Sequence, residues 1–182
     1  MIGSPFRVSL ITLVAAVLVG GCAIARVEEQ DPAEIPDGPL EDMGFEATGP
    51  ITELGRGRTM GIGWRYAIFE SADGWCTQLD MAGLSSAGCG DLPPREGTAF
   101  GSVGSGGPSD GLSPVEGIVS SNVSEVWITA STGQRIETIL MPLAEARLDG
   151  KAFLGFAPAG VTPDTVVAIG SDGQELEAFD LP

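Results

Sequence analysis

The sequence predicts a mostly β protein: an antiparallel β-sandwich or barrel-like domain built of hairpins, preceded by a signal peptide and a flexible acidic linker. Two observations predict the β domain. Apolar and polar residues alternate over several short stretches, and turn signals separate these stretches at a spacing typical of sandwiches and barrels. A third observation, a shift in composition near residue 60, separates this domain from the segment before it.

Residues 1–21 have the features of a secretory signal peptide. Arg7 is their only charged side chain, and Val8 to Val19 is apolar apart from Ser9 and Thr12. A basic start, an apolar stretch of about a dozen residues and small residues at the end are typical of export signals.

The end of this segment, Val19-Gly20-Gly21-Cys22, resembles the lipobox of bacterial lipoproteins, in which an aliphatic residue and two small residues precede a cysteine. The resemblance implies that fatty acyl groups such as palmitate are attached to Cys22 and that the chain is cut before it. The mature lipoprotein would be anchored to the cell membrane on its extracytoplasmic face. Several acyl chains anchor a protein firmly, whereas a single chain holds it only weakly.

Two other fates of the N-terminus stay open. Ala23-Ile24-Ala25 is a small-x-small cleavage site that would discard Cys22 and release a soluble protein. Val8 to Ala25 is a run of 18 uncharged residues. Such a run is long enough for an uncleaved membrane-spanning helix at about 1.5 Å per residue. All three readings place residues 26–182 outside the cytoplasm.

The composition limits the partners. The chain carries 25 acidic and 9 basic side chains, a net charge of −16. Nucleic-acid phosphates are bound by clustered Lys and Arg, so no nucleic-acid partner is expected. Anionic lipid head groups are disfavoured for the same reason, so a membrane link would depend on the lipid. The expected partners are the membrane, through its lipid anchor, and a protein or polymer of the cell envelope.

Composition also divides the mature chain. Residues 22–60 are rich in Glu, Asp, Pro and Gly and show no apolar periodicity. This predicts a lipidated N-terminus followed by a flexible acidic tether. Residues 61–182 are predicted to form the β-rich globular domain, which is long enough for one hydrophobic core.

Alternation and turn signals place the strands of this domain. Residues 64–69 and 75–81 predict a hairpin around the turn 71–74, and the Gly- and Ser-rich stretch 97–113 predicts a weak strand and then a loop. One or two helical turns are expected within 142–149. Further strands are predicted at 123–131, 134–141, 151–157, 165–171 and 174–180.

Two hairpin turns, Thr132-Gly133 and Asp172-Gly173, lie in similar surroundings. Gly133-Gln134-Arg135-Ile136-Glu137 aligns with Gly173-Gln174-Glu175-Leu176-Glu177. Either an internal duplication or a shared turn chemistry explains the match, and two copies are too few for a solenoid. Both explanations favour paired, Greek-key-like hairpins.

Cys76 and Cys89 are the pair that remains once Cys22 is set aside. In an oxidising compartment such a pair predicts a disulfide, here a local staple with its Cα atoms about 4.4–6.8 Å apart. No metal or other cofactor is expected. The chain has no histidine and no C-x-x-C motif for zinc, and its acidic turns lack the spaced pattern of a calcium loop.

The segment Trp64 to Cys76, together with Gly88-Cys89-Gly90 and the Gly173 hairpin, resembles small Cys-paired β domains in secreted proteins of high-GC bacteria. This likeness implies a style of fold and no activity.

Catalytic motifs are weak. Gly107-Pro108-Ser109-Asp110-Gly111 matches the letters of the G-x-S-x-G nucleophile elbow, but the match lies in a predicted loop, and the chain has no histidine to act as the base. We therefore expect no catalytic residue and a non-catalytic binding or scaffolding domain. The alternative is an extracytoplasmic hydrolase or transferase that uses a pair of carboxylates, which the sequence cannot select.

Aromatic residues suggest where a partner binds. Trp64 and Trp127 occupy alternating strand positions and are expected in the core. Trp75 lies between a turn and the disulfide and is the candidate for an exposed binding surface, together with the loops around Cys89 and Gly104–Gly111. We expect this surface to be shallow, without a cleft of converging titratable groups.

The lipobox leads to a test of processing. The mature protein should begin at Cys22, carry fatty acyl groups and partition into detergent, and Cys22→Ala should abolish lipid labelling. Intact-mass measurement of the exported chain checks this expectation. An unmodified chain beginning at Arg26 would contradict it.

Overall fold

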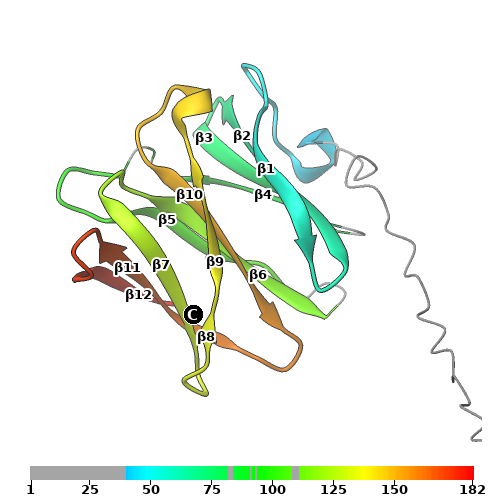
Figure 1. Ribbon diagram of the computed structural model, residues 1–182. Helices are drawn as coiled ribbons and strands as arrows, with labels where there is room; N and C mark the ends of the chain where they lie inside the picture. Colours follow the sequence, from blue (N-terminus) through cyan, green and yellow to red (C-terminus); the bar gives the residue numbers. More distant parts are fainter. Residues whose placement is uncertain (1–39, 82–83, 91, 93, 108–110) are drawn as a thin grey trace, which may run out of the picture.

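The computed structural model describes residues 40–81, 84–90, 92, 94–107 and 111–182. It contains three four-stranded antiparallel sheets, which stay open and do not close into a barrel (Figure 1). The predicted antiparallel, mostly β fold is therefore confirmed.

Each sheet has its own strand order. Sheet A is β1 (Thr52–Thr59), β2 (Ile62–Ser71), β3 (Gly74–Met81) and β4 (Leu84–Gly90). Sheet B is β5 (Phe100–Ser105), β6 (Leu112–Val119), β10 (Lys151–Pro158) and β9 (Thr138–Pro142). Sheet C is β12 (Glu175–Asp180), β11 (Pro163–Gly170), β7 (Val123–Ala130) and β8 (Arg135–Ile136). Two short 3-10 helices, η2 (Leu40–Met43) and η3 (Ala144–Ala146), complete the elements.

Sheet B is the middle layer, and both of its faces are buried. One face places Ile118 and Leu154 in a hydrophobic core shared with Tyr66 of sheet A. The other face places Val115 and Phe153 in a second core with sheet C. Because neighbouring residues of a strand point to opposite faces, β6 and β10 must supply both cores. In place of the single core expected from the sequence, two cores lie between the sheets, and a small third cluster lies on the outer face of sheet A.

The folded unit begins before residue 61, where the sequence analysis placed its start. β1 lies within the predicted tether and pairs with β2. Its inward positions include Gly57, where a Cβ would lie 2.8 Å from the Trp64 ring. The apolar periodicity is missing from β1 because glycine makes room there for a large side chain of the next strand. The segment from η2 to Phe45 also packs on Phe69, on the outer face of sheet A.

Two other strands were not predicted. β4 is a short strand of small residues, and its pairing with β3 is what orders it. β6 has the sequence Leu-Ser-Pro-Val-Glu-Gly-Ile-Val, in which no simple alternation is visible. Its Gly117 is required by a close approach, since a Cβ there would lie 2.5 Å from Cε1 of Phe153. A strand packed on both faces is selected for fit to its neighbours and loses the pattern of a half-exposed strand.

The two C-terminal hairpins have the same turn. Gly133 N donates to Ala130 O and Ala130 N to Gln134 O. The equivalent bonds run from Gly173 N to Gly170 O and from Gly170 N to Gln174 O. Gly133 and Gly173 have positive φ angles of 80° and 82°. Both hairpins belong to sheet C, and their common turn is expected whether the matching sequences result from duplication or from shared turn chemistry.

The stretch predicted as one strand at 134–141 is divided between two sheets. Its first part, β8, pairs with β7 in sheet C, and its second part, β9, pairs with β10 in sheet B. Glu137 lies at the crossing. As a result the edges of β8 and β9 follow one another along one side of the molecule.

The predicted disulfide joins Cys76 of β3 to Cys89 of β4. The two residues are direct partners in the strand register. Their Cα atoms are 4.0 Å apart, closer than the expected range, because directly opposed residues of antiparallel strands approach to about 4.5 Å in close pairs. The Ser71 hydroxyl lies 3.2 Å from Cys76 Sγ, so the bridge also contacts the preceding turn.

The disulfide leads to a stability prediction. The double variant Cys76→Ser, Cys89→Ser should lose about 3 kcal/mol of unfolding free energy, because the open chain gains entropy when it unfolds. Urea unfolding measures this loss. Amide NMR shifts of residues 123–136 should stay unchanged, since sheet B lies between sheet C and the sheet that contains the bridge. Free thiols titrating in the native exported protein would contradict the prediction.

Candidate functional site

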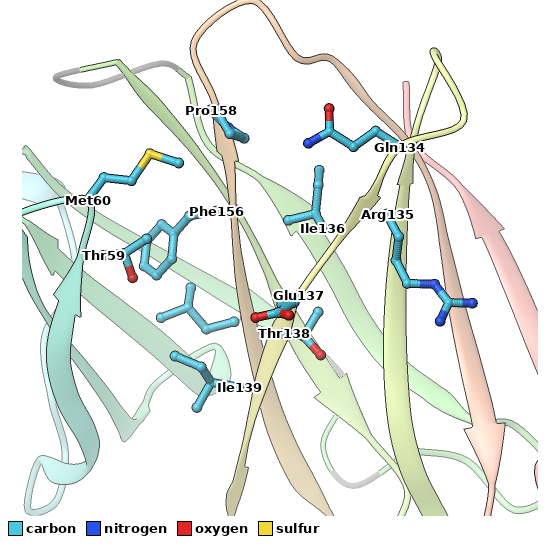
Figure 2. A pocket seen from close by; sticks show the side chains of 11 residues that line it. Thr59, Met60, Gln134, Arg135, Ile136, Glu137, Thr138, Ile139, Phe156 and Pro158 are labelled. Atoms are coloured by element: carbon cyan, nitrogen blue, oxygen red, sulfur yellow. The ribbon is translucent and has the colours of Figure 1, made fainter.

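An apolar groove lies where edge strands of the three sheets come together (Figure 2). Its volume is about 320 Å³. The β1–β2 turn forms one wall with Thr59 and Met60, and the consecutive strands β8 and β9 form the other. Leu154 and Phe156 of β10 lie between these walls.

The walls of the groove carry exposed hydrophobic side chains. Met60 is 67% exposed and Ile139 is 39% exposed, large values for apolar residues. Met60 also has a positive φ of 52°, which non-glycine residues rarely adopt, so the tight turn holds this side chain at the groove. Polar residues at positions 134, 135 and 137 line the same groove. An apolar floor with a polar rim is typical of a binding site.

A second candidate site is the carboxyl group of Glu116, in the interface between sheets A and B. Glu116 lies on the face of β6 that also carries Leu112 and Ile118 toward sheet A. Its Oε2 atom and the hydroxyl oxygen of Tyr66 are both buried, and neither has a hydrogen-bond partner among the described residues. Such unsatisfied buried polar atoms are uncommon and often mark functional sites.

The environment shifts both groups. Burial raises the pKa of Glu116, and the nearby hydroxyls of Tyr66 and Thr77 offset this rise only in part. Burial, and then the charge of Glu116, raises the pKa of the Tyr66 hydroxyl well above its ordinary value. No cation contributes to the pKa of Glu116, so only the hydroxyls of Tyr66 and Thr77 stabilise its charged form in the interface.

A small cavity opens beside Glu116, between the edge strands β4 and β5. Its volume is about 120 Å³. Glu116 is the only carboxylate among the described residues that line it. The predicted surface near Cys89 and Gly104 is therefore a cavity beside a buried acid, which corrects the expectation of a shallow surface. The sequence gives no signal for Glu116, because it is a lone acid in β6, and the predicted strands and loops leave residues 114–122 unassigned.

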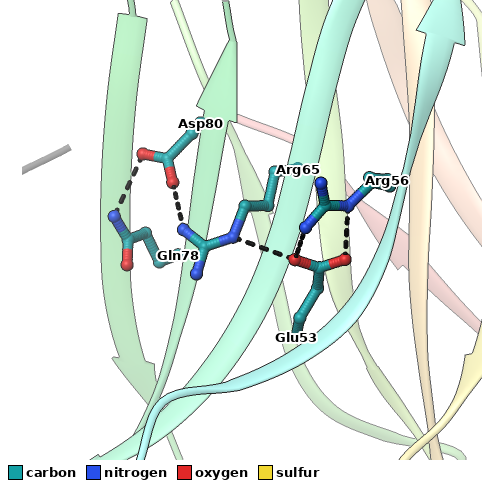
Figure 3. A network of polar contacts seen from close by, with 5 residues as sticks. All are labelled: Glu53, Arg56, Arg65, Gln78 and Asp80. Carbon is teal, nitrogen blue, oxygen red and sulfur yellow. Dashed lines mark hydrogen bonds and ion pairs between the residues drawn. The ribbon is translucent and has the colours of Figure 1, made fainter. Parts of the chain in front are cut away.

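The other buried acid, Asp80, lies on the opposite face of sheet A. It accepts hydrogen bonds from Arg65 and Gln78, both at 3.0 Å (Figure 3). Arg65 also bonds Glu53 at 3.2 Å, and Glu53 accepts from Arg56 at 2.6 Å. The Arg56 hydrogen bond lowers the pKa of Glu53. Asp80 thus belongs to a paired network and does not form a carboxylate pair with Glu116.

The three tryptophans have different environments. Trp64 is buried in the first core, as predicted. Trp127 is not in the core. Its neighbours Val126 and Ile128 point into the second core, so Trp127 faces outward, with the Arg135 guanidinium 3.5 Å from the ring centroid. Trp75, the predicted binding residue, is partly buried and packs against the first core, so its ring both supports packing and reaches the surface.

Several predicted features lie outside the described residues: the signal peptide, Cys22 and Ser109 of the G-x-S-x-G match. Within the part of the chain that the structure covers, no helix has the length and apolar character of a membrane span. The same residues contain no group of three or more Cys, Asp or Glu side chains able to share a metal ion.

The chain was compared with models of protein families, with curated proteins and with solved structures, and none of these comparisons found a match. The functional argument therefore depends on the two sites themselves.

The raised pKa of Glu116 leads to a pH prediction. Below its ordinary pKa of 4.5 the carboxyl is protonated in both the folded and the unfolded chain, and burial costs little. As the pH rises through the raised pKa, the folded chain must hold a buried charge, so this contribution to stability is lost. Glu116→Gln should remove this loss. Between acid and neutral pH, the unfolding free energy of the variant should therefore rise relative to that of the wild type.

Urea unfolding at several pH values between 4 and 8 measures this difference. Glu125→Gln is the matched control, because Glu125 is exposed on sheet C and the same charge is removed. Equal pH dependence in the wild type and in Glu116→Gln would contradict the assignment.

Proposed function

We propose that this protein is an exported lipoprotein, anchored through Cys22, whose β domain binds an extended segment of a protein partner in the cell envelope without catalysis. The observation that supports this best is the apolar groove between β1 and the β8–β9 edge. The lipobox-like end of the signal peptide supports the anchor, and the acidic residues that follow provide a spacer between membrane and domain.

The sheet edges explain why an extended segment fits. β1 ends sheet A and β9 ends sheet B, so among the described strands each has one side without a partner. Where the two edges meet, Gly55 lies against Met141. The groove opens further along, between Thr59 and Ile139. An added peptide strand can pair with a free edge while its apolar side chains fill the neighbouring groove.

One observation favours the alternative, a carboxylate-dependent hydrolase or transferase. Glu116 is a buried acid with a raised pKa beside a cavity, as expected of a general acid. A glycosidase, however, needs two carboxylates about 5–10 Å apart on either side of the bond that is cut. The described lining of this cavity supplies one. Turnover of a substrate that is lost in Glu116→Gln would favour the enzyme over the binding domain.

The groove leads to a binding prediction. Extended peptides with apolar side chains, selected from a displayed library, should bind the wild type in the groove. Ile139→Asp should weaken their binding by about tenfold or more, because it places a charge in an apolar contact. Fluorescence anisotropy measures the affinity.

Ile51→Asp is the matched control, since Ile51 is 43% exposed and does not line the groove. The control should bind selected peptides as the wild type does. The groove would be contradicted as the binding site if both variants weakened binding equally. It would also be contradicted if the selected peptides bound Ile139→Asp with the same affinity as the wild type.

A further inference from the structure

The cavity beside Glu116 is separate from the groove. The groove involves the β1 and β9 edges of sheets A and B, whereas the cavity lies at the opposite edges, between β4 and β5. Cys89 and Gly88 of β4 line one side, and Ser102 and Gly104 of β5 line the other.

The strand register shows that the polar groups of this cavity converge. Gly104 is the partner of Glu116, and Gly88 is the partner of Thr77, so each pair points to the same face of its sheet. Ser102 pairs with Ile118, which faces sheet A. Thr77 of sheet A and Glu116 and Ser102 of sheet B therefore face one another across the interface.

Glycine keeps the cavity open. Any side chain at position 88 or 104 would point toward Thr77 or Glu116, because cross-strand partners share a face. A Cβ at either position would meet no atom within 4 Å. Both glycines are exposed, so they form an open mouth with a buried carboxyl oxygen behind it.

No cationic side chain is among the described residues that line the cavity. Glu116 Oε2 and the Tyr66 hydroxyl oxygen are unpartnered among the described residues, and the hydroxyls of Thr77 and Ser102 can also accept. An uncompensated buried carboxylate is costly, and a compact cation with several N–H donors would compensate it.

The ligand set favours an ammonium group over a metal ion. Calcium binds six to eight oxygens, usually with several carboxylates, whereas the described lining has one carboxylate. An alkylammonium group has three donors on a compact charge, which matches one carboxylate and two hydroxyls. The volume of about 120 Å³ equals about four water molecules at ~30 Å³ each, enough for a short alkylammonium.

No lysine of the chain supplies this ammonium. Lys151 is its only lysine, and the Lys151 ammonium already donates to the Val123 carbonyl oxygen between sheets B and C. The net charge of −16 would attract a cationic ligand from solution.

We propose that the cavity between β4 and β5 binds a primary alkylammonium group, held by the Glu116 carboxylate and the hydroxyls of Thr77 and Ser102. The group comes from a lysine side chain of a partner or from a free small amine. The binding of ammonium competes with protonation of Glu116, so its raised pKa predicts tighter binding as the pH rises.

The test is an NMR titration of the full chain in detergent with butylammonium, and separately with Nα-acetyl-lysine methylamide. The amide signals of Thr77, Ser102 and Glu116 should shift and saturate with either ligand. Glu116→Gln should weaken binding by about tenfold or more, because it removes the charged partner. Glu125→Gln, an exposed acid of sheet C, should bind as the wild type does. Tighter binding of the lysine derivative would identify a partner's lysine as the source, and tighter binding of butylammonium a free amine.

A second variant tests the location. Gly104→Val should block the cavity and abolish the shifts while Glu116 remains, and thermal unfolding checks that both variants are folded. The proposal would be overturned if no saturable shifts appeared, or if Glu116→Gln and Glu125→Gln weakened binding equally. Unchanged binding by Gly104→Val would also overturn it.

Discussion

Burial of sheet B on both faces is the constraint on which the rest of the structure depends. Its strands β6 and β10 supply side chains to two cores at once, Ile118 and Leu154 toward sheet A and Val115 and Phe153 toward sheet C. A middle strand has no solvent face on which a charged side chain can lie. Any acid there enters an interface between two sheets, and β6 contains Glu116, which is half-buried with its Oε2 atom fully buried.

The stacking of three open sheets also determines where function can reside. Each sheet ends in edge strands, and the boundaries between the layers include an apolar groove at β1, β8 and β9 and a small cavity beside Glu116 between β4 and β5. The first lacks a buried charge and suits an apolar segment. The second contains a buried carboxyl oxygen and suits a cation. Two sites of opposite chemistry thus result from one architecture.

The acidic groups of sheet A show that a buried carboxylate has a structural role when an arginine pairs with it. Asp80 is almost fully buried, yet Arg65 and Gln78 both bind it, and this network extends to Glu53 on β1. Its role is to hold three strands together on the outer face. Glu116 lies on the inner side of the interface and has no such cation. Burial alone therefore does not distinguish Glu116 from Asp80, whereas burial without a cation does.

The sequence by itself determined the antiparallel β class, the hairpin turns at Gly133 and Gly173 and the pairing of Cys76 with Cys89, because turns, alternation and disulfides are local signals. It could not show β1 or β6. Gly57 of β1 makes room for Trp64, and in β6 Gly117 makes room for Phe153 and Glu116 interacts with Tyr66, so these residues are explained only by contacts with other strands. It also could not decide that Trp127 faces outward, since Val126, Trp127 and Ile128 are three consecutive apolar residues. Only the tertiary structure assigned the strands to three layers and brought Thr77 and Glu116 together, because contacts between distant segments depend on packing that no local pattern records.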